Sequence, residues 1–272
     1  MPVAADPRSG DPVGRGAYLF RAAGCLGCHT DEKNGGTPLA GGRGLATPFG
    51  TFYSPNITPH PERGIGRWTD ADFIRAFRKG KRPDGASLFP VFPYASYTRM
   101  TDRDLLDLKA YLFAQPPSEA VNKAHDVWPP FSWRFLVPVW QAMYLTPGPV
   151  PDDPGKPPEW NRGRYLVDAL GHCAECHSPR TLLGGLDADR YLAGNPEGPD
   201  GDEVPNITAH KTEGIGDWTP GDITLLLELG LTPDGDVAGG AMGEVIRNST
   251  SKLTAEDRSA IAAYLLSVPP KE

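Results

Sequence analysis

The chain contains an internal repeat, and this repeat constrains its fold more than any other feature of the sequence. The segment Pro55–Thr58 recurs as Pro205–Thr208 with the same four residues, 150 positions later. The triplet Pro83–Gly85 recurs at the same offset as Pro233–Gly235. Two copies of one domain are therefore predicted in the 272 residues. We expect a first domain over residues 1–115, a Pro- and Trp-rich connecting strap over 116–158, and a second domain over 159–272.

All four cysteines of the chain fall in two Cys-x-x-Cys-His motifs at equivalent places of the repeat, Cys25–His29 and Cys173–His177. Cysteines at positions i and i+3 lie on one face of a helical turn, so both thiols can reach the two vinyl groups on one porphyrin edge. The histidine that follows then points its imidazole at the iron. The motifs predict two covalent haem c groups per chain. The attaching residues are Cys25, Cys28, Cys173 and Cys176, and the axial histidines are His29 and His177.

Four cysteines also allow a four-cysteine zinc site or a pair of disulfides. Neither alternative explains why a histidine follows each cysteine pair, or why the two pairs occupy equivalent places of a repeat. Haem attachment explains both observations.

The sixth ligand of each iron has to come from elsewhere in its domain. A methionine thioether opposite histidine gives a haem of raised potential, and the chain has only four methionines. Met242 lies in Gly239–Gly243, which we predict to be a loop, and is the candidate in the second domain. The repeat offset places Phe92, which cannot ligate iron, at the corresponding position of the first domain. Met100 is the candidate substitute there, and the alternatives are a packing role for Met100, ligation by His60, or a five-coordinate iron.

Each copy is predicted to contain three main helices joined by long Gly- and Pro-rich loops. The first helix runs into the cysteine motif, from about Gly14 and from about Asn161. The second begins at Thr69, and the third at Thr101 or Thr254. The hydrophobic fraction is only 39%, so a buried cofactor would replace part of the missing core, at about 25 cal/mol per Å². The expected class is mainly α.

The charge balance excludes some partners and the hydropathy excludes a membrane span. With a net charge of −7, the chain is a poor binder of nucleic acid. No segment reaches the ~20 apolar residues of a membrane span. Residues 1–6 show neither a basic nor an apolar region of a signal peptide. Because haem c is attached outside the cytoplasm, we expect a periplasmic protein whose leader has been removed.

Several segments together resemble the multihaem cytochrome c subunits of bacterial membrane-bound alcohol and gluconate dehydrogenases. They are the two Pro-Asn-Ile-Thr segments, Gly-Ile-Gly-x-Trp-Thr in both copies, Phe89–Met100 and Asn248–Thr254. The resemblance implies two tandem class I cytochrome c-like domains, with long Gly/Pro-rich loops around covalently bound haems. It also implies a periplasmic, often membrane-associated relay. Such a relay accepts electrons from a flavin or quinoprotein catalytic subunit and passes them to quinone, an oxidase or another cytochrome.

Electron transfer is the predicted function, with redox proteins as partners and no catalytic residue of its own. A dihaem peroxidase-like enzyme is the alternative, because Phe92 leaves a coordination position open on the first haem. We recognise no distal His/Glu pair for O–O cleavage, and the close repeat favours two domains of like purpose. A haem-based gas sensor would need an output domain, and none is recognisable.

Overall fold

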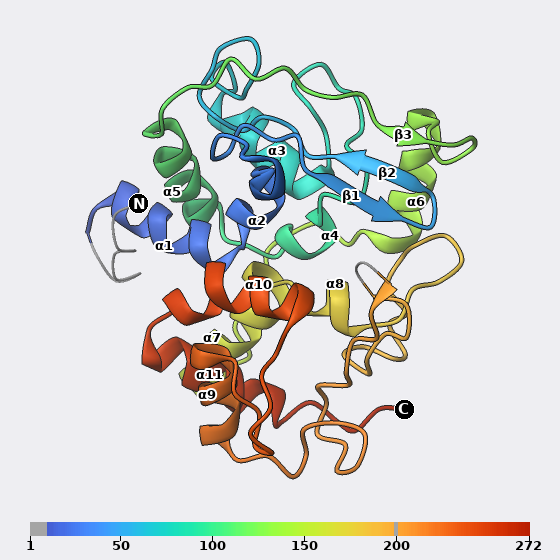
Figure 1. The fold of residues 1–272 in the computed structure, drawn as a ribbon. Helices are drawn as coiled ribbons and strands as arrows, with labels where there is room; N and C mark the ends of the chain where they lie inside the picture. The colour runs from blue at the N-terminus through green and yellow to red at the C-terminus, as the bar shows by residue number, and fades with distance from the viewer. Residues whose placement is uncertain (1–9, 199–200) are drawn as a thin grey trace. The chain divides into compact units, whose positions relative to one another are not determined.

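The computed structural model describes residues 10–198 and 201–272 (Figure 1). About 41% of the chain is helical and strands are few, so the prediction of a mainly α protein is confirmed. The chain divides into two compact units, Met1–Pro149 and Val150–Glu272. Residues 1–6, in which the sequence shows no signal peptide, lie outside the described residues. Within the described part, no helix is both long and apolar enough to cross a membrane.

The first unit combines helices with one small sheet. Its helices are α1 (Pro12–Ala22), α2 (Cys25–His29), α3 (Asp70–Lys79), α4 (Tyr94–Tyr97), α5 (Asp102–Phe113) and α6 (Val137–Tyr144). Its strands are β1 (Gly44–Thr47), β2 (Gly50–Tyr53) and β3 (Asp126–Val127). The strands form an antiparallel sheet in the order β1-β2-β3, with Gly44 opposite Tyr53 and Thr51 opposite Asp126.

The second unit has counterparts of α1 to α5. It contains α7 (Pro158–Tyr165), a π-helical turn (Leu166–Leu170), α8 (Ala174–His177), α9 (Pro220–Leu229), α10 (Gly240–Asn248) and α11 (Ala255–Leu265). The three helices predicted for each copy are all present. The prediction of a loop over Gly239–Gly243 is wrong, because α10 begins at Gly240 and carries Met242. Gly240 and Gly243 lower the helix propensity of this segment, so the sequence did not indicate a helix. The buried side chain of Ile246 packs the helix against the rest of the unit.

Threonines start the second and third helices of each unit, as the sequence predicts. The Thr69 side chain caps α3 and accepts from the Asp72 N–H, and Asp72 bonds back to the Thr69 backbone. Thr219 and Asp222 form the same capping box on α9. Such boxes satisfy N–H groups that a helix leaves without partners at its start.

One glycine in each unit lets two helices cross closely, α1 with α5 and α7 with α11. A Cβ atom on Gly16 of α1 would lie 2.0 Å from the Asp107 carbonyl oxygen of α5. A Cβ atom on Gly163 of α7 would lie 1.9 Å from the Ala260 carbonyl oxygen of α11. Only glycine fits at either crossing. The crossing therefore accounts for the glycine shared by two equivalent segments of the repeat, Arg15–Leu19 and Arg162–Leu166.

Part of the segment between the repeats, residues 126–144, packs on the first unit. Helix α6 lies beside the sheet (Figure 1), and its Val137 is buried in a cluster with Phe52 and Phe89. The Trp140 ring meets the Tyr94 ring edge-on, with centroids 6.1 Å apart. Val137 and Trp140 thus attach this segment to the first unit, whereas Trp128, Trp133 and Phe135 are exposed.

Candidate haem sites

The two cysteine motifs form short helical turns that follow the first helix of each unit. In the first unit, Gly24 adopts a left-handed conformation (φ 62°) that separates α2 from α1. In the second, His172 (φ 42°) makes the corresponding break, and the His177 N–H then donates to the Cys173 carbonyl at 2.9 Å. Each turn thus brings two thiols and one imidazole together, as the spacing predicts.

The histidine of each motif is held by a backbone carbonyl. Nδ1 of His29 lies 2.8 Å from the Pro55 carbonyl oxygen, and Nδ1 of His177 lies 2.8 Å from that of Pro205. Because a carbonyl only accepts, the proton sits on Nδ1 and the lone pair on Nε2. Burial lowers the pKa of both histidines and keeps the rings neutral. A neutral imidazole with its second nitrogen anchored is the form that binds a metal.

The Pro-Asn-Ile-Thr segments shape the loops that supply these carbonyls. The Asn56 side-chain oxygen accepts from the Thr58 N–H at 2.9 Å and from the Thr58 hydroxyl at 2.7 Å. Asn206 accepts from Thr208 in the same way, at 2.8 and 2.7 Å. The four side chains are buried. This part of the repeat therefore fixes the backbone beside each histidine.

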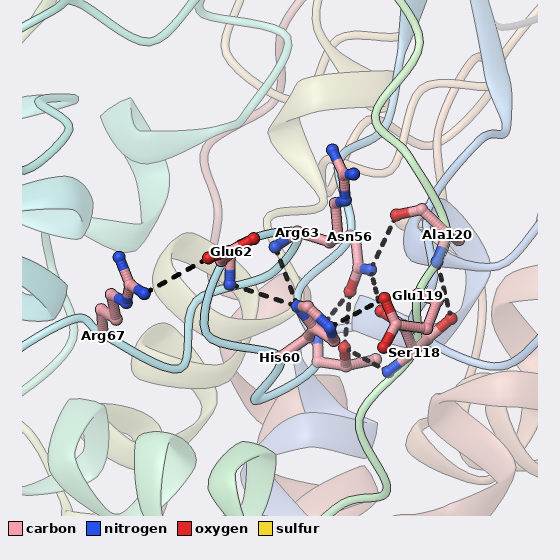
Figure 2. A network of polar contacts seen from close by, with 9 residues as sticks. Asn56, His60, Glu62, Arg63, Arg67, Ser118, Glu119 and Ala120 are labelled. Atoms are coloured by element: carbon pink, nitrogen blue, oxygen red, sulfur yellow. Dashed lines mark hydrogen bonds and ion pairs between the residues drawn. The ribbon is translucent and has the colours of Figure 1, made fainter.

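In the first unit, a network around Asn56 and His60 ties this loop to the segment after α5 (Figure 2). The Asn56 amide donates to the Ser118 carbonyl at 2.9 Å. Nδ1 of His60 accepts from the Arg63 N–H at 3.0 Å, and its Nε2 lies 3.0 Å from a Glu119 carboxylate oxygen. Both nitrogens of His60 thus contact protein groups, so this arrangement does not support His60 as an iron ligand.

The cysteines show no sign of a shared metal site. Burial raises the pKa of Cys25 and of Cys173 to about 12. Throughout residues 10–198 and 201–272, no group of three or more His, Cys, Asp or Glu side chains is placed to hold a metal ion. Two thiols on one turn and a buried neutral histidine fit a covalently attached haem instead.

The hydrogen bonding supports the alignment of Phe92 with Met242. The Leu88 N–H donates to the Gly80 carbonyl at 2.7 Å, and the Ala238 N–H donates to Gly230 at 2.8 Å. Phe92 and Met242 each come four residues after these equivalent contacts. Met242 is half-buried on α10.

Phe92 and Met100 lie in different surroundings within the first unit. The Phe92 ring packs against the rings of Phe77 and Tyr97, with centroids 5.1 and 5.6 Å away. Met100 is fully buried directly before the Thr101 cap, where the second unit has a buried Leu253. In the second unit this position is therefore occupied by a core side chain. Ligation of the first iron by Met100 stays a prediction.

Two arginines at the cysteine motifs escaped the sequence analysis. Nη1 of Arg43 donates to the Gly27 carbonyl at 2.5 Å, and Nη2 of Arg180 donates to the Glu175 carbonyl at 2.6 Å. Arg43 and Arg180 are not at equivalent positions of the repeat, so an alignment of the two copies does not pair them. Only the fold brings each of them to a motif.

Comparison with known proteins agrees with this chemistry. Residues 13–114 match the cytochrome c family. The chain is 44% identical to a dihaem cytochrome c-type protein of Cereibacter sphaeroides, over 100% of this chain and 92% of the relative. It is 39% identical to the cytochrome c subunit of a quinone alcohol dehydrogenase of Gluconobacter oxydans, over 94% of this chain and 55% of the relative. It is 37% identical to the gluconate 2-dehydrogenase cytochrome c subunit of Pantoea cypripedii, over 98% and 62%.

The first of these relatives matches along almost its whole length, whereas the chain spans little more than half of the two dehydrogenase subunits. The prediction of two haem c groups is confirmed by the family and by the dihaem relative. The resemblance to dehydrogenase cytochrome subunits is confirmed as well. This chain belongs to the cytochrome c family and is a dihaem member of it.

Proposed function

We propose that the chain is an electron carrier, with no catalytic residue, which serves a periplasmic or membrane-bound dehydrogenase. It takes electrons from the catalytic subunit and passes them to quinone, an oxidase or another cytochrome. The repeated histidine–carbonyl contact carries this proposal: both units prepare a neutral imidazole for iron at the same 2.8 Å distance. Two like sites suit a relay of single electrons. The dehydrogenase cytochrome subunits among the relatives suggest the donor.

Each unit is proposed to contain one class I cytochrome c-like domain, over 1–115 in the first and 159–272 in the second, with residues 116–158 as the strap between the domains. Their Gly/Pro-rich loops would enclose the haems. The matching helix crossings at Gly16 and Gly163 support this.

The proposed ligand sets follow from the motifs. Cys25 and Cys28 would attach the first haem, and Cys173 and Cys176 the second. His29 and His177 would bind the irons on one side. Met242 is the proposed sixth ligand of the second haem and Met100 that of the first. A haem with histidine and thioether ligands supplies one-electron chemistry at raised potential.

A peroxidase-like function has only Phe92 in its favour. The named relatives are cytochromes and cytochrome subunits, and none of these names points to peroxide chemistry. We therefore do not carry this alternative further.

The proposal is tested with the tagged holoprotein in native periplasmic and membrane extracts. Candidate substrates such as alcohols and sugar acids are added one at a time, and reduction of the haems is followed by absorption. We expect reduction of both haems that depends on one substrate, and co-purification of the dehydrogenase that oxidises it. The Cys173→Ala/Cys176→Ala protein, which should lack the second haem, is the control. No reduction with any substrate, together with rapid turnover of peroxide, would contradict the carrier role.

A further inference from the structure

We propose that Arg43 and Arg180 are positioning residues that raise the reduction potentials of the first and second haem, by holding a positive charge against the turn that anchors each one. The inference rests on the proposed haem sites and electron-transfer role. It adds residues that lie outside the cysteine motifs and outside the axial ligands.

The two contacts are made to the same point of the two motifs. Gly27 and Glu175 are each the residue before the second cysteine, and their carbonyl oxygens accept from the guanidinium groups at 2.5 and 2.6 Å. Each of these carbonyls belongs to the peptide whose N–H is that of Cys28 or Cys176. Each charge therefore lies one peptide away from a haem-attaching cysteine.

The arginines reach this point by different routes. The Gly41 N–H donates to the His29 carbonyl at 2.9 Å, and the Gly194 N–H donates to the His177 carbonyl at 2.8 Å, so these glycines are equivalent. Arg43 follows the first of them by two residues. The second unit has Pro196 at that place and uses Arg180, three residues after His177. The same contact made from two different positions indicates a requirement shared by both turns.

A purely structural explanation has to be separated from this one. The last carbonyls of a short helix need donors, and a basic side chain commonly supplies them. That need is met by any donor of suitable reach. A fixed charge beside the haem does more, because it disfavours the ferric state, which carries one positive charge more than the ferrous state. Nearby charge and hydrogen bonding are among the means by which a protein sets a haem potential.

Glu175 allows the direction of the change in reduction potential to be tested within the second unit. Its carboxylate lies 2.7 Å from Nη2 of Arg180, and the two side chains are 14% and 33% exposed. The carboxylate offsets part of the guanidinium charge. Removing the carboxylate charge should therefore raise the second potential, whereas removing the guanidinium should lower it.

The experiment is a spectroelectrochemical titration of the holoprotein and its variants. The haems are assigned with single-haem proteins, Cys25→Ala/Cys28→Ala and Cys173→Ala/Cys176→Ala. We expect Arg43→Gln to lower only the first potential and Arg180→Gln only the second. Arg43→Lys and Arg180→Lys should recover most of each loss, and Glu175→Gln should raise the second potential. The shifts should shrink at high salt, because salt screens partly exposed charges.

Matched controls remove a cation whose partner lies outside the cysteine motifs. Arg103→Gln does so on α5, where the guanidinium lies 4.0 Å from Asp107. Lys156→Gln does so before α7, where the ammonium lies 5.2 Å from the centre of the Trp160 ring. Both controls should leave the potentials unchanged.

Each outcome decides a separate point. Unchanged potentials in the glutamine variants, with lowered thermal stability, would overturn the proposal and leave the arginines as helix caps. Equal shifts in the lysine and glutamine variants would exclude the charge as the cause. If Arg180→Gln does not mature, Glu175→Gln still gives the sign of the effect at the second haem. Loss of covalent haem from the single-haem proteins themselves would refute the proposed sites rather than this inference.

Discussion

The Nδ1 atom of His177 lies 2.8 Å from the carbonyl oxygen of Pro205, and the contact decides which nitrogen of the ring can face a metal. The proline belongs to the Pro-Asn-Ile-Thr segment, whose Asn206 and Thr208 side chains fix the backbone there. The Pro-Asn-Ile-Thr segment contains no metal ligand, yet its proline carbonyl orients the histidine of the cysteine motif. His29 and Pro55 repeat the arrangement at the same distance.

Covalent attachment at both motifs predicts a mass shift of two haems. Protein matured by a periplasmic c-haem assembly system should keep both additions after denaturation, because thioether bonds survive unfolding. Cys25→Ala should weaken attachment in the first unit alone, and Cys173→Ala in the second alone. Mass spectrometry of the denatured proteins measures this, and a chain carrying one addition or none would refute the assignment.

The crossing of α7 and α11 predicts a large loss of stability for Gly163→Ala. The added Cβ would lie 1.9 Å from the Ala260 carbonyl oxygen, so the helices must separate. Overpacking of this kind costs roughly 1–3 kcal/mol. Gly221→Ala is the matched control, because the nearest atom to its new Cβ is a side-chain oxygen at 3.5 Å. It should raise stability by up to about 1 kcal/mol. Denaturant unfolding of the holoproteins tests both.

The capping box of α9 predicts a dependence of stability on pH. The Thr219 N–H and hydroxyl each donate to the Asp222 carboxylate at 2.8 Å and lower its pKa from the ordinary value of 3.8. A group whose pKa is lowered by folding stabilises the protein above its unfolded pKa, and this contribution is lost as the pH falls through the folded value. The difference in Tm between wild type and Asp222→Asn should therefore be present at neutral pH and shrink as the pH falls below about 4. A constant difference across this range would contradict the charge-based explanation.

Much of this structure could be predicted from the sequence because its signals are local. The caps at Thr69 and Thr254 and the cysteine motifs each act within a few residues, so pattern and spacing suffice. The β1-β2 hairpin was missed because its strands are four residues long, which is too short for an alternating apolar and polar pattern to be recognised. Helix α10 was missed because Gly240 and Gly243 lower its propensity while tertiary packing of Ile246 holds it. Contacts such as those of Arg43 and Arg180 depend on loop paths that no local pattern encodes.

Met242 is expected to determine the spectrum and potential of the second haem. Met242→Ala should remove the far-red iron–sulfur charge-transfer band and lower the potential of that haem, since a thioether favours ferrous iron. The first haem should be unaffected. Near-infrared absorption and a redox titration measure the two effects. An unchanged band and potential would show that Met242 only packs within its unit.

The first haem allows the sharpest test, because the repeat breaks there. Phe92 aligns with Met242 and packs against Phe77, with ring centroids 5.1 Å apart, so the proposed sixth ligand is Met100. Met100→Leu keeps most of the packing volume and removes the sulfur. The structure supports leucine as a tolerated replacement, because Leu253 fills the equivalent buried place in the second unit. We therefore expect a folded protein in which carbon monoxide or cyanide binds readily to one additional haem per chain.

The outcome distinguishes two kinds of first haem. If wild type resists small ligands and Met100→Leu admits them, the chain holds two six-coordinate haems suited to rapid single-electron transfer. If both proteins bind carbon monoxide equally, with the same spectrum, Met100 is a core residue like Leu253 and the first iron is open. Phe92→Met then offers the converse test, since a methionine at that place could close the site. The segment up to the next helix is three residues shorter than in the second unit: nine positions separate Phe92 from Thr101, and twelve separate Met242 from Thr254. A restored charge-transfer band in Phe92→Met would therefore show that the methionine reaches the iron despite this shorter segment.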